Sequence, residues 1–272
     1  MRFTSFASGS TGNCALLSDG STHILIDAGI SMRRITKCLA QLDLREQDVA
    51  GVLITHEHRD HTAALNTMVK RGKMRVFAPR TVGNHLRWTV PDMDSCLTVI
   101  PVDEPFALGG LTVTAFHTSH DTDESVGYRF SGSAEFACCT DTGCITEKML
   151  ESLSGVDAAM IEANHDVQLL RYGSYPYQLK RRVLSEHGHL SNEDCAKLCA
   201  RLCETGASKL VLAHLSRENN RPELALQTVG MHLEALGYLP ELRAAPMDGF
   251  CSIEFERREA ECCSSGSSAA AG

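Results

Sequence analysis

The chain has 272 residues, of which 43% are apolar and 22% are charged. That composition is typical of a globular protein and excludes a mostly disordered chain, because there is enough apolar surface to build a core. Acidic side chains outnumber basic ones by 34 to 26, so the formal charge is −8 and the protein does not coat nucleic acid by net charge alone. No run of about eighteen apolar residues occurs, and the sequence therefore predicts no membrane-spanning segment.

The cysteine content does not indicate an exported, disulfide-stabilised protein. The chain has twelve cysteines but no C-x-x-C pair, and its N-terminus lacks the long apolar segment of a secretory signal. Cys195, Cys199 and Cys203 recur every four residues, which places them on one face of a helix. We interpret them as small core residues rather than as metal ligands. The sequence therefore predicts a protein of the reducing cytoplasm.

Short apolar runs joined by turn residues predict a chain with many strands. Asp19-Gly20 separates two such runs and is a hairpin signal. The run at 52–54 is typical of a buried strand and ends at a group of histidines. The expected strands are 3–7, 14–18, 23–27, 52–54, 75–78, 97–102, 111–116, 127–130, 136–140, 160–161, 209–213 and 252–256.

Helices are expected between some of these strands, where capping residues precede apolar side chains at helical spacing. The segment 164–189 has only weak periodicity and is assigned no element. The expected helices begin after Ser31, at Ser191-Asn192-Glu193-Asp194 and at Pro222, and the last two end near Gly206 and Gly237.

A single domain is expected over residues 1–258, because no interior linker or repeat interrupts the pattern. Strands interspersed with helices predict sheets that are covered by helices on their outer faces. The segment 259–272 is a low-complexity stretch rich in serine, alanine and glycine, and we expect it to be a disordered tail.

The strongest chemical signal is a cluster of histidines directly after the strand at 52–54. His56, His58, Asp60 and His61 lie within six residues. Alternate residues of a loop can point to the same side, so His56 and His58 could hold one cation while Asp60 and His61 turn toward a second. Imidazole and carboxylate ligands suit zinc, manganese or iron.

Four further residues share the same local setting, since each follows the end of an apolar strand. They are Asp27, His120, Asp141 and His214. Taken singly, each is best explained as a buried, hydrogen-bonded residue. Strand ends that converge on one edge would instead bring them together with the histidine cluster, and we therefore predict one metal site.

The pattern His56-x-His58-x-Asp60-His61 matches the H-x-H-x-D-H signature of the metallo-β-lactamase fold, and the resemblance extends to about Arg257. It implies an α/β fold, a four-layer αβ/βα sandwich with a dinuclear metal site at one edge. His117 is an alternative to His120, which we prefer because Ser119-His120-Asp121 leads into Gly127-Tyr128 as in nuclease members. By this resemblance, His56, His58 and His120 hold one ion, Asp60, His61 and His214 hold the other, Asp141 bridges both, and Asp27 supports a ligand by a hydrogen bond.

Longer stretches resemble the YycJ/WalJ group of double-strand DNA 5′-exonucleases. Glu162 and His189 also resemble a Glu and His pair of ribonuclease Z, which assists phosphodiester cleavage. The resemblance implies a phosphodiesterase that acts on double-stranded DNA. The stretches are Ser8-Gly9-Ser10-x-Gly12-Asn13-Cys14, Asn164-His165-Asp166, Tyr175-Pro176 with Leu179-Lys180-x-Arg182, Gly188-His189-Leu190-Ser191-Asn192, and His214-Leu215-Ser216-x-Glu218-Asn219-Asn220.

Such a reaction needs a nucleophile, charge neutralisation and an acid for the leaving group. Two cations about 3.5–4 Å apart supply the first two, because a water between them loses a proton near neutral pH. We expect Asp60 to accept that proton. His189, oriented by Glu162, is the candidate to protonate the leaving oxygen.

Contacts to DNA phosphates are expected from the basic part of the chain. The stretches 62–91 and 167–185 contain no acidic residue. Phosphate contacts provide most of the affinity for nucleic acid, and tyrosines can stack on a terminal base. The candidates are Lys180, Arg181, Arg182, the stacking residue Tyr175 with its neighbours Tyr172 and Tyr177, and Ser191 and Asn192 at a helix N-terminus.

Other functions remain open for a site of this composition. The main alternative is a thioesterase or lactonase of the glyoxalase-II type, which would have the same metal site but no evident need for the basic stretches. A binding module without catalysis would not need a full ligand set with an open position. A flavodiiron-type reductase would need a flavin domain, for which the chain has no length left.

Overall fold

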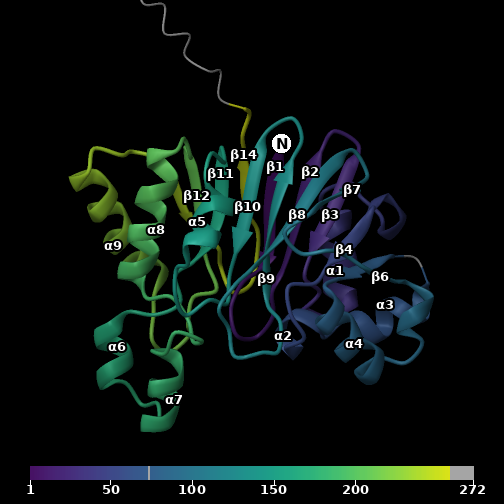
Figure 1. Ribbon diagram of the computed structural model, residues 1–272, viewed down its shortest axis with the longest axis horizontal. Helices are drawn as coiled ribbons and strands as arrows, with labels where there is room; N and C mark the ends of the chain where they lie inside the picture. Colours follow the sequence, from purple (N-terminus) through teal and green to yellow (C-terminus); the bar gives the residue numbers. More distant parts are fainter. Residues whose placement is uncertain (73, 258–272) are drawn as a thin grey trace, which may run out of the picture.

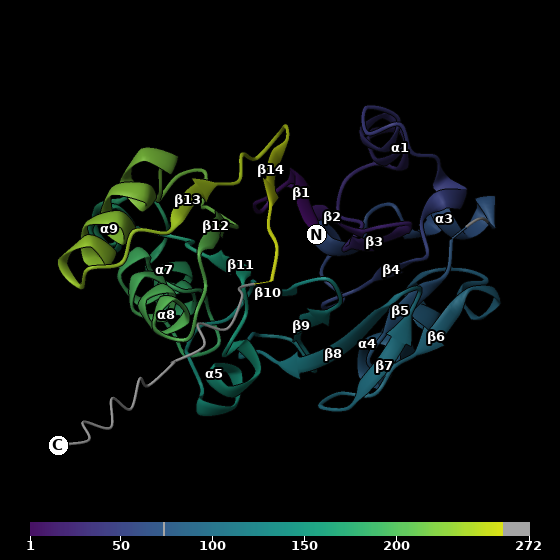
Figure 2. The same ribbon diagram turned by 90° about the horizontal axis from the view of Figure 1, so that it is seen from above.

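The computed structural model describes residues 1–72 and 74–257 and shows two β-sheets packed face to face, with helices on both outer faces (Figures 1 and 2). This arrangement confirms the predicted four-layer sandwich. The predicted tail, 259–272, lies outside the described residues. Within the described part of the chain, no helix has the length and apolar character needed to cross a bilayer.

The first sheet has seven strands in the order β14-β1-β2-β3-β4-β5-β6. Strands β14 to β3 pair antiparallel, and β3 to β6 pair parallel. The carboxyl ends of the parallel strands therefore meet at one edge. The strands are β1 (Arg2–Ala7), β2 (Cys14–Asp19), β3 (Thr22–Ile26), β4 (Gly51–Leu53), β5 (Val76–Ala78), β6 (Leu97–Val99) and β14 (Cys251–Glu254).

The second sheet has the order β13-β12-β11-β10-β9-β8-β7. Here β7 to β10 pair antiparallel and β10 to β13 pair parallel, so β8, β10, β11 and β12 all end at one edge. The strands are β7 (Pro105–Leu108), β8 (Leu111–His117), β9 (Val126–Ser131), β10 (Glu135–Cys139), β11 (Ala158–Glu162), β12 (Lys209–Ala213) and β13 (Glu241–Ala244).

Helices cover the outer faces of both sheets (Figure 2). Ser31 and Ser191 cap α1 and α8 as predicted, each accepting a hydrogen bond from the backbone three residues later. Short 3-10 turns form at Glu46–Asp48 and Met93–Ser95. On the first sheet lie α1 (Met32–Ala40), α2 (Arg59–Thr62), α3 (Leu65–Arg71) and α4 (Arg80–Thr89), and on the second lie α5 (Glu147–Leu153), α8 (Asn192–Glu204) and α9 (Pro222–Ala235).

Two further helices, α6 (Val167–Tyr172) and α7 (Tyr177–Val183), extend beyond the edge of the second sheet (Figure 1). They lie in the segment 164–189, where the weak periodicity of the sequence gave no prediction of an element. Each helix has fewer than eight residues, so neither shows a clear hydrophobic period. The short α3 and α5 were not predicted for the same reason. The sequence analysis also did not predict α4, β7 and β13, and their lengths do not explain this.

Three apolar clusters hold the layers together. The cluster between the sheets contains stacked aromatic rings such as Phe3 and Phe136, whose centroids are 4.8 Å apart. Ile35 and Leu39 of α1 pack on the outer face of the first sheet, and Cys195 and Cys199 of α8 pack on that of the second. The cysteines of α8 are therefore core residues, as predicted.

Candidate metal centre

The predicted metal ligands meet at the edge where the parallel strands end, close to α2 in Figure 1. His56 follows β4, and Asp60 and His61 lie in the first turn of α2 rather than in a loop. Asp141 follows β10 and His214 follows β12. The structure therefore brings together side chains that are far apart in the sequence and that follow strands of both sheets.

One group of ligand atoms consists only of imidazoles. Nε2 of His56 lies 3.1 Å from Nδ1 of His58. The ring of His120 lies edge-on to both, with centroids 5.1 and 5.2 Å away. These three residues offer ligand atoms within 4.8 Å of one another, and they are the predicted ligands of the first ion.

A second group combines a carboxylate with imidazoles. Oδ2 of Asp60 lies 3.6 Å from Nε2 of His61 and 3.8 Å from Nε2 of His214. Asp141 lies between the two groups, since its Oδ2 is 3.4 Å from Nε2 of His61 and its Oδ1 is 3.7 Å from Nε2 of His120. This placement is what a bridging ligand requires.

Unpartnered buried atoms indicate that this cluster fits divalent cations. Oδ2 of Asp141 and Nε2 of His214 are buried and make no hydrogen bond to a described residue. Leaving such groups unpaired costs several kcal/mol, of the order of 2–7, unless a cation or other partner satisfies them. Nitrogen and carboxylate oxygen donors suit zinc, manganese and iron alike.

The outer nitrogens of the imidazoles are fixed by other side chains. Nδ1 of His61 lies 2.8 Å from Oδ2 of Asp27, whose Oδ1 accepts a hydrogen bond from the Thr55 amide at 2.9 Å. Asp27 therefore makes the kind of contact that would orient His61 if His61 binds a metal ion. The other pairings are His56 Nδ1 with Thr55 Oγ1 at 3.0 Å and His120 Nδ1 with the Gly188 carbonyl at 3.2 Å.

Glu162, at the end of β11, is fully buried and has all its acceptor positions in use. Its Oε1 lies 2.8 Å from Nδ1 of both His189 and His214. Its Oε2 accepts from the backbone amides of Thr142 and Leu190 at 3.1 and 3.2 Å. Burial acts to raise the pKa of Glu162, but the two histidines outweigh burial and hold that pKa well below its usual range.

Electrostatics divide the cluster into two sides. Burial lowers the pKa of His56 well below its usual range, and His61 and His120 lower it further. Burial also lowers the pKa of His61, but Asp27 and Asp141 outweigh burial and raise that pKa to about 9. Burial therefore favours the neutral form of His56, which metal binding requires, whereas the carboxylates around His61 favour positive charge.

The backbone around the centre adopts conformations that side chains rarely take. Asp27, Asp141 and His214 have φ values of 59°, 57° and 54°. Such conformations in non-glycine residues cluster at functional sites, where surrounding contacts maintain them. Gly29 is needed for a different reason, because a Cβ there would lie 1.6 Å from the carbonyl oxygen of Asp60.

The comparison with protein families agrees with this geometry. A family model described as the beta-lactamase superfamily domain matches residues 22–215, which is more than half of the chain. The chain belongs to the metallo-β-lactamase superfamily. It is therefore a hydrolase of that superfamily, with clusters of residues that could hold metal ions.

Two curated relatives match most of this superfamily member. The Exodeoxyribonuclease YycJ of Bacillus anthracis is 36% identical over 247 residues, which cover 88% of this chain and 91% of the relative. The Exodeoxyribonuclease WalJ of Streptococcus pneumoniae is 35% identical over 237 residues, covering 84% and 86%. The resemblance to the YycJ/WalJ group is thus confirmed.

Solved structures of the metallo-β-lactamase fold superpose on the whole sandwich. The YhfI protein of Bacillus subtilis has a TM-score of 0.71 at 14% identity, covering 93% of this chain and all of that one. Zinc-bound PqqB of Methylobacterium extorquens has a TM-score of 0.72 at 18% identity, covering 94% of this chain and all of that one. At these identities the likeness shows the fold alone.

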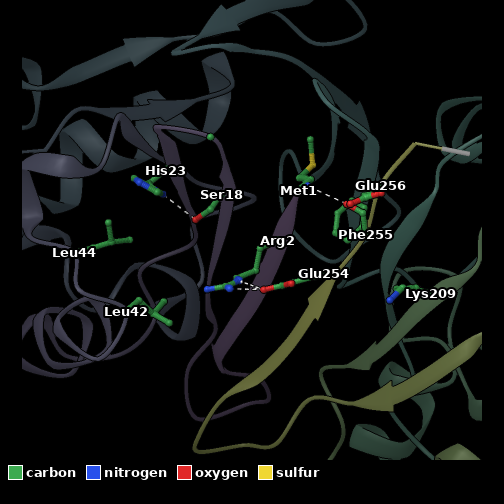
Figure 3. Close-up of a pocket in the computed structure, with 11 residues that line it drawn as sticks. Met1, Arg2, Ser18, His23, Leu42, Leu44, Lys209, Glu254, Phe255 and Glu256 are labelled. Atoms are coloured by element: carbon green, nitrogen blue, oxygen red, sulfur yellow. Dashed lines mark hydrogen bonds and ion pairs between the residues drawn. The ribbon is translucent and has the colours of Figure 1, made fainter.

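A pocket of about 160 Å³ opens directly beside the metal centre of this metallo-β-lactamase fold. His120, His189 and His214 form its inner wall, while Tyr175 and Arg182 line it from the α6–α7 region. A larger cavity of about 670 Å³ is lined by Met1, Arg2, Glu254 and other residues (Figure 3). It lies at the start of β1, at the opposite end of the sandwich from the centre.

Several predicted substrate contacts do not line the pocket. The Lys180 ammonium donates to the carbonyls of Arg171 and Gly173 at 2.9 and 2.8 Å, which ties α7 to the end of α6. The guanidinium of Arg181 lies 5.9 Å from the ring centroid of Tyr177. These contacts stabilise the α6–α7 region itself.

The start of α8 is also occupied by internal hydrogen bonds. Ser191 Oγ accepts from the amide of Asp194 at 3.0 Å, and the Asn192 amide donates to the carbonyl of His165 at 2.9 Å. The fully buried Asn192 side chain exchanges hydrogen bonds with that of Asn220 at 3.0 and 2.8 Å. Ser191 and Asn192 therefore form a buried connection behind the pocket.

Sequence reasoning missed two polar residues at the centre. Nδ2 of Asn13 lies 2.9 Å from Nε2 of His61 and 3.3 Å from Oδ2 of Asp60. Oδ1 of Asp121 lies 3.3 Å from Nε2 of His120. Asn13 belongs to one of the stretches shared with the exonuclease group, and Asp121 to the Ser119-His120-Asp121 motif, but neither signal indicated a contact with a ligand atom.

Proposed function

We propose that the protein is a metal-dependent phosphodiesterase that removes nucleotides from the 5′ ends of double-stranded DNA. The names of the YycJ and WalJ relatives support an exonuclease that acts on DNA. The observation that carries the proposal is the Glu162–His189 pair, whose histidine lines a pocket beside the candidate metal ligands. This pair adds an acid to the metal centre, and the acid is what a phosphodiester leaving group needs.

In this proposal the chain binds two divalent cations, of zinc, manganese or iron. Such ions, when bound, supply an activated water and neutralise charge on the phosphate. The donor set includes both groups of ligand atoms described above, with Asp141 between them. The proposed ligands are His56, His58 and His120 for one ion, Asp60, His61 and His214 for the other, and Asp141 for both.

Asp60 and His189 are the residues that handle the proposed reaction's water and leaving group. The pKa of Asp60 is held well below its usual range, because His61 and His214 outweigh the effect of burial, so its carboxylate is ionised and can orient the attacking water by accepting a hydrogen bond from it. His189 holds Nδ1 against Glu162 and lines the pocket, which leaves Nε2 to donate to the leaving oxygen. Carboxylates outweigh burial and raise the pKa of His189, which favours the protonated acid form.

The substrate contacts of the proposed enzyme are Arg182 and Tyr175, since both line the pocket. Arg182 provides the positive charge, and Tyr175 offers a ring for stacking on a base. The remaining lining is mostly polar, which suits a sugar-phosphate better than the acyl chain of a thioester. We also propose a cytoplasmic location, where thiols such as those of Cys14 and Cys138 stay reduced.

The test uses metal-loaded protein with duplex DNA labelled at the 5′ or 3′ end, and with RNA and a thioester as competing substrates. Release of 5′ label in short products, with no thioester hydrolysis, is the expected result. His58→Ala should lose at least one metal equivalent and most turnover. His85→Ala is the matched control, because His85 is exposed on α4. Thioester cleavage without DNA cleavage would refute the proposal.

A further inference from the structure

The guanidinium of Arg182 is oriented through only one of its nitrogens. Nε donates to Oδ2 of Asp121, and no hydrogen bond joins either Nη group to another residue within 1–72 or 74–257. The Arg182 side chain is 58% exposed and lines the pocket. A guanidinium held in this way presents its two Nη groups as a fork that matches two oxygens of a phosphate.

Asp121 places this fork next to the metal centre. While its Oδ2 accepts from Arg182, its Oδ1 lies 3.3 Å from Nε2 of His120, a proposed ligand atom. The Asp121 carboxylate therefore lies between the Arg182 guanidinium and the imidazole of His120. A phosphate held by Arg182 would be a neighbour of the phosphodiester that is cleaved, rather than the cleaved group itself.

The pocket is suited to an anion and too small for a continuing strand. Asp121 is the only acidic residue among those that line it, and its charge is offset by Arg182. Ser10, Ser216 and Asn219 add polar groups. Its volume of about 160 Å³ lies below the roughly 300–1,000 Å³ of sites that hold whole small-molecule ligands. A phosphate group fits this space, whereas a base pair does not.

We propose that Arg182, held in position by Asp121, binds the terminal 5′-phosphate of a DNA strand, so that the enzyme selects 5′-phosphorylated ends over 5′-hydroxyl ends. This inference rests on the proposed 5′-exonuclease function and adds the chemistry of the end that it recognises. Asp121 is a positioning residue that acts through Arg182. Charge-assisted hydrogen bonds of this kind correspond to a preference of roughly ten- to hundredfold in kcat/KM.

The experiment compares two duplexes that differ only in a 5′-phosphate or a 5′-hydroxyl at the end attacked, each labelled internally and at the 3′ end of the strand. Wild-type protein should prefer the phosphorylated duplex. Arg182→Gln should bring the ratio of the two kcat/KM values close to one, mainly by raising KM on the phosphorylated duplex. Asp121→Asn should reduce the ratio in part. Arg201→Gln is the control, since Arg201 pairs with Glu204 on α8 and does not line the pocket.

The outcomes separate the inference from the proposed function. Equal wild-type rates on the two 5′ ends, or an Arg182→Gln variant that keeps the wild-type ratio, would overturn the inference and leave a 5′-exonuclease. Loss of metal from Asp121→Asn, measured by elemental analysis, would make Asp121 a ligand and overturn its positioning role. Cleavage from the 3′ end, or no DNA cleavage, would refute the proposed function and the inference with it.

Discussion

A single carboxylate, that of Glu162, contacts two histidines with different proposed tasks. Its Oε1 lies at the same distance, 2.8 Å, from His214, a proposed ligand, and from His189, the proposed acid. Two backbone amides fix its other oxygen, so the carboxylate cannot turn toward one imidazole without losing the other contacts. The geometry of the metal centre and that of the proton donor are therefore set together.

The proposed role of His189 predicts a selective loss of turnover. His189→Ala should retain both metals and bind DNA within a few-fold of wild type, because the proposed ligands do not include His189. Its turnover on DNA should fall by roughly 10²–10⁴, the usual effect of losing a general acid. A p-nitrophenyl phosphodiester, whose leaving group needs no proton, should recover much of this loss in steady-state assays.

Equal impairment of His189→Ala on both substrates would instead mean that His189 binds phosphate or supports the fold. Metal loss from this variant, measured by elemental analysis, would show that the ligand assignment is wrong at this position.

His165 predicts a dependence of stability on pH. The side chain is 1% exposed, and neither ring nitrogen forms a hydrogen bond with a described residue. Burial lowers its pKa to about 4, although Glu162 acts in the opposite direction. An unfolded chain binds this proton near pH 6.5, so between these pH values the unfolded state holds more protons and stability falls as pH falls.

The free energy of unfolding should therefore drop by about 2 kcal/mol through His165 alone between about pH 7.5 and pH 5. His165→Leu should remove that part of the slope, because leucine has no proton to gain. Urea unfolding of both proteins at the two pH values measures the difference. His85→Leu, at an exposed position, is the control. Identical slopes for wild type and His165→Leu would contradict the prediction.

The candidate metal ligands could be predicted from the sequence because each follows a recognisable apolar strand. The substrate-binding residues could not be predicted in the same way. Lys180 and Asn192 had the right residue types for phosphate contact, but their hydrogen-bonding groups are used by Gly173 and Asn220, which only the tertiary structure brings near. Partners of polar side chains are set by long-range contacts, and a local pattern does not contain them.

At the scale of elements, helices could be predicted where a clear capping residue precedes several turns of helical spacing. Ser191 and Pro222 mark the starts of α8 and α9, which have 13 and 14 residues and show helical spacing. The shorter α6 and α7 contain few apolar positions and depend on tertiary contacts, such as that of Lys180 with the end of α6. The walls of the substrate pocket are thus the part of the fold that sequence reasoning described least well.

The cap of α8 provides a test of whether Ser191 serves the fold or the substrate. Ser191→Ala removes the side chain that accepts from the Asp194 amide and should cost about 1 kcal/mol of stability. Ser191→Thr keeps a hydroxyl that accepts from this amide and donates to the Asp194 carboxylate, and should retain most of that stability. Because Ser191 is buried, both variants should keep the DNA affinity of wild type. Denaturant unfolding and DNA titration measure the two effects.

A direct phosphate contact from Ser191 would give a different pattern. Ser191→Ala would then lose DNA affinity as well as stability, whereas Ser191→Thr would keep both.

At the scale of the whole molecule, the proposed ligands divide between the two halves of the sandwich. His56, His58, Asp60 and His61 follow β4 of the first sheet, whereas His120, Asp141 and His214 follow strands of the second. The layers were predictable from strand and helix patterns together with the family resemblance. The order of strands was not, because pairing between distant segments leaves no local signal.

Since both halves contribute ligands, metal binding should stabilise the whole fold rather than one loop. A ligand that binds only the folded state adds RT ln(1 + [L]/Kd), about 4 kcal/mol at a thousandfold excess over Kd. Protein stripped with a chelator should therefore unfold at a lower temperature than the same protein reloaded with zinc or manganese. Calorimetry of His58→Ala should show a smaller rise on reloading, and His85→Ala should show the full rise. An unchanged Tm in stripped and reloaded wild-type protein, with metal content verified, would mean that the two halves do not share the ions.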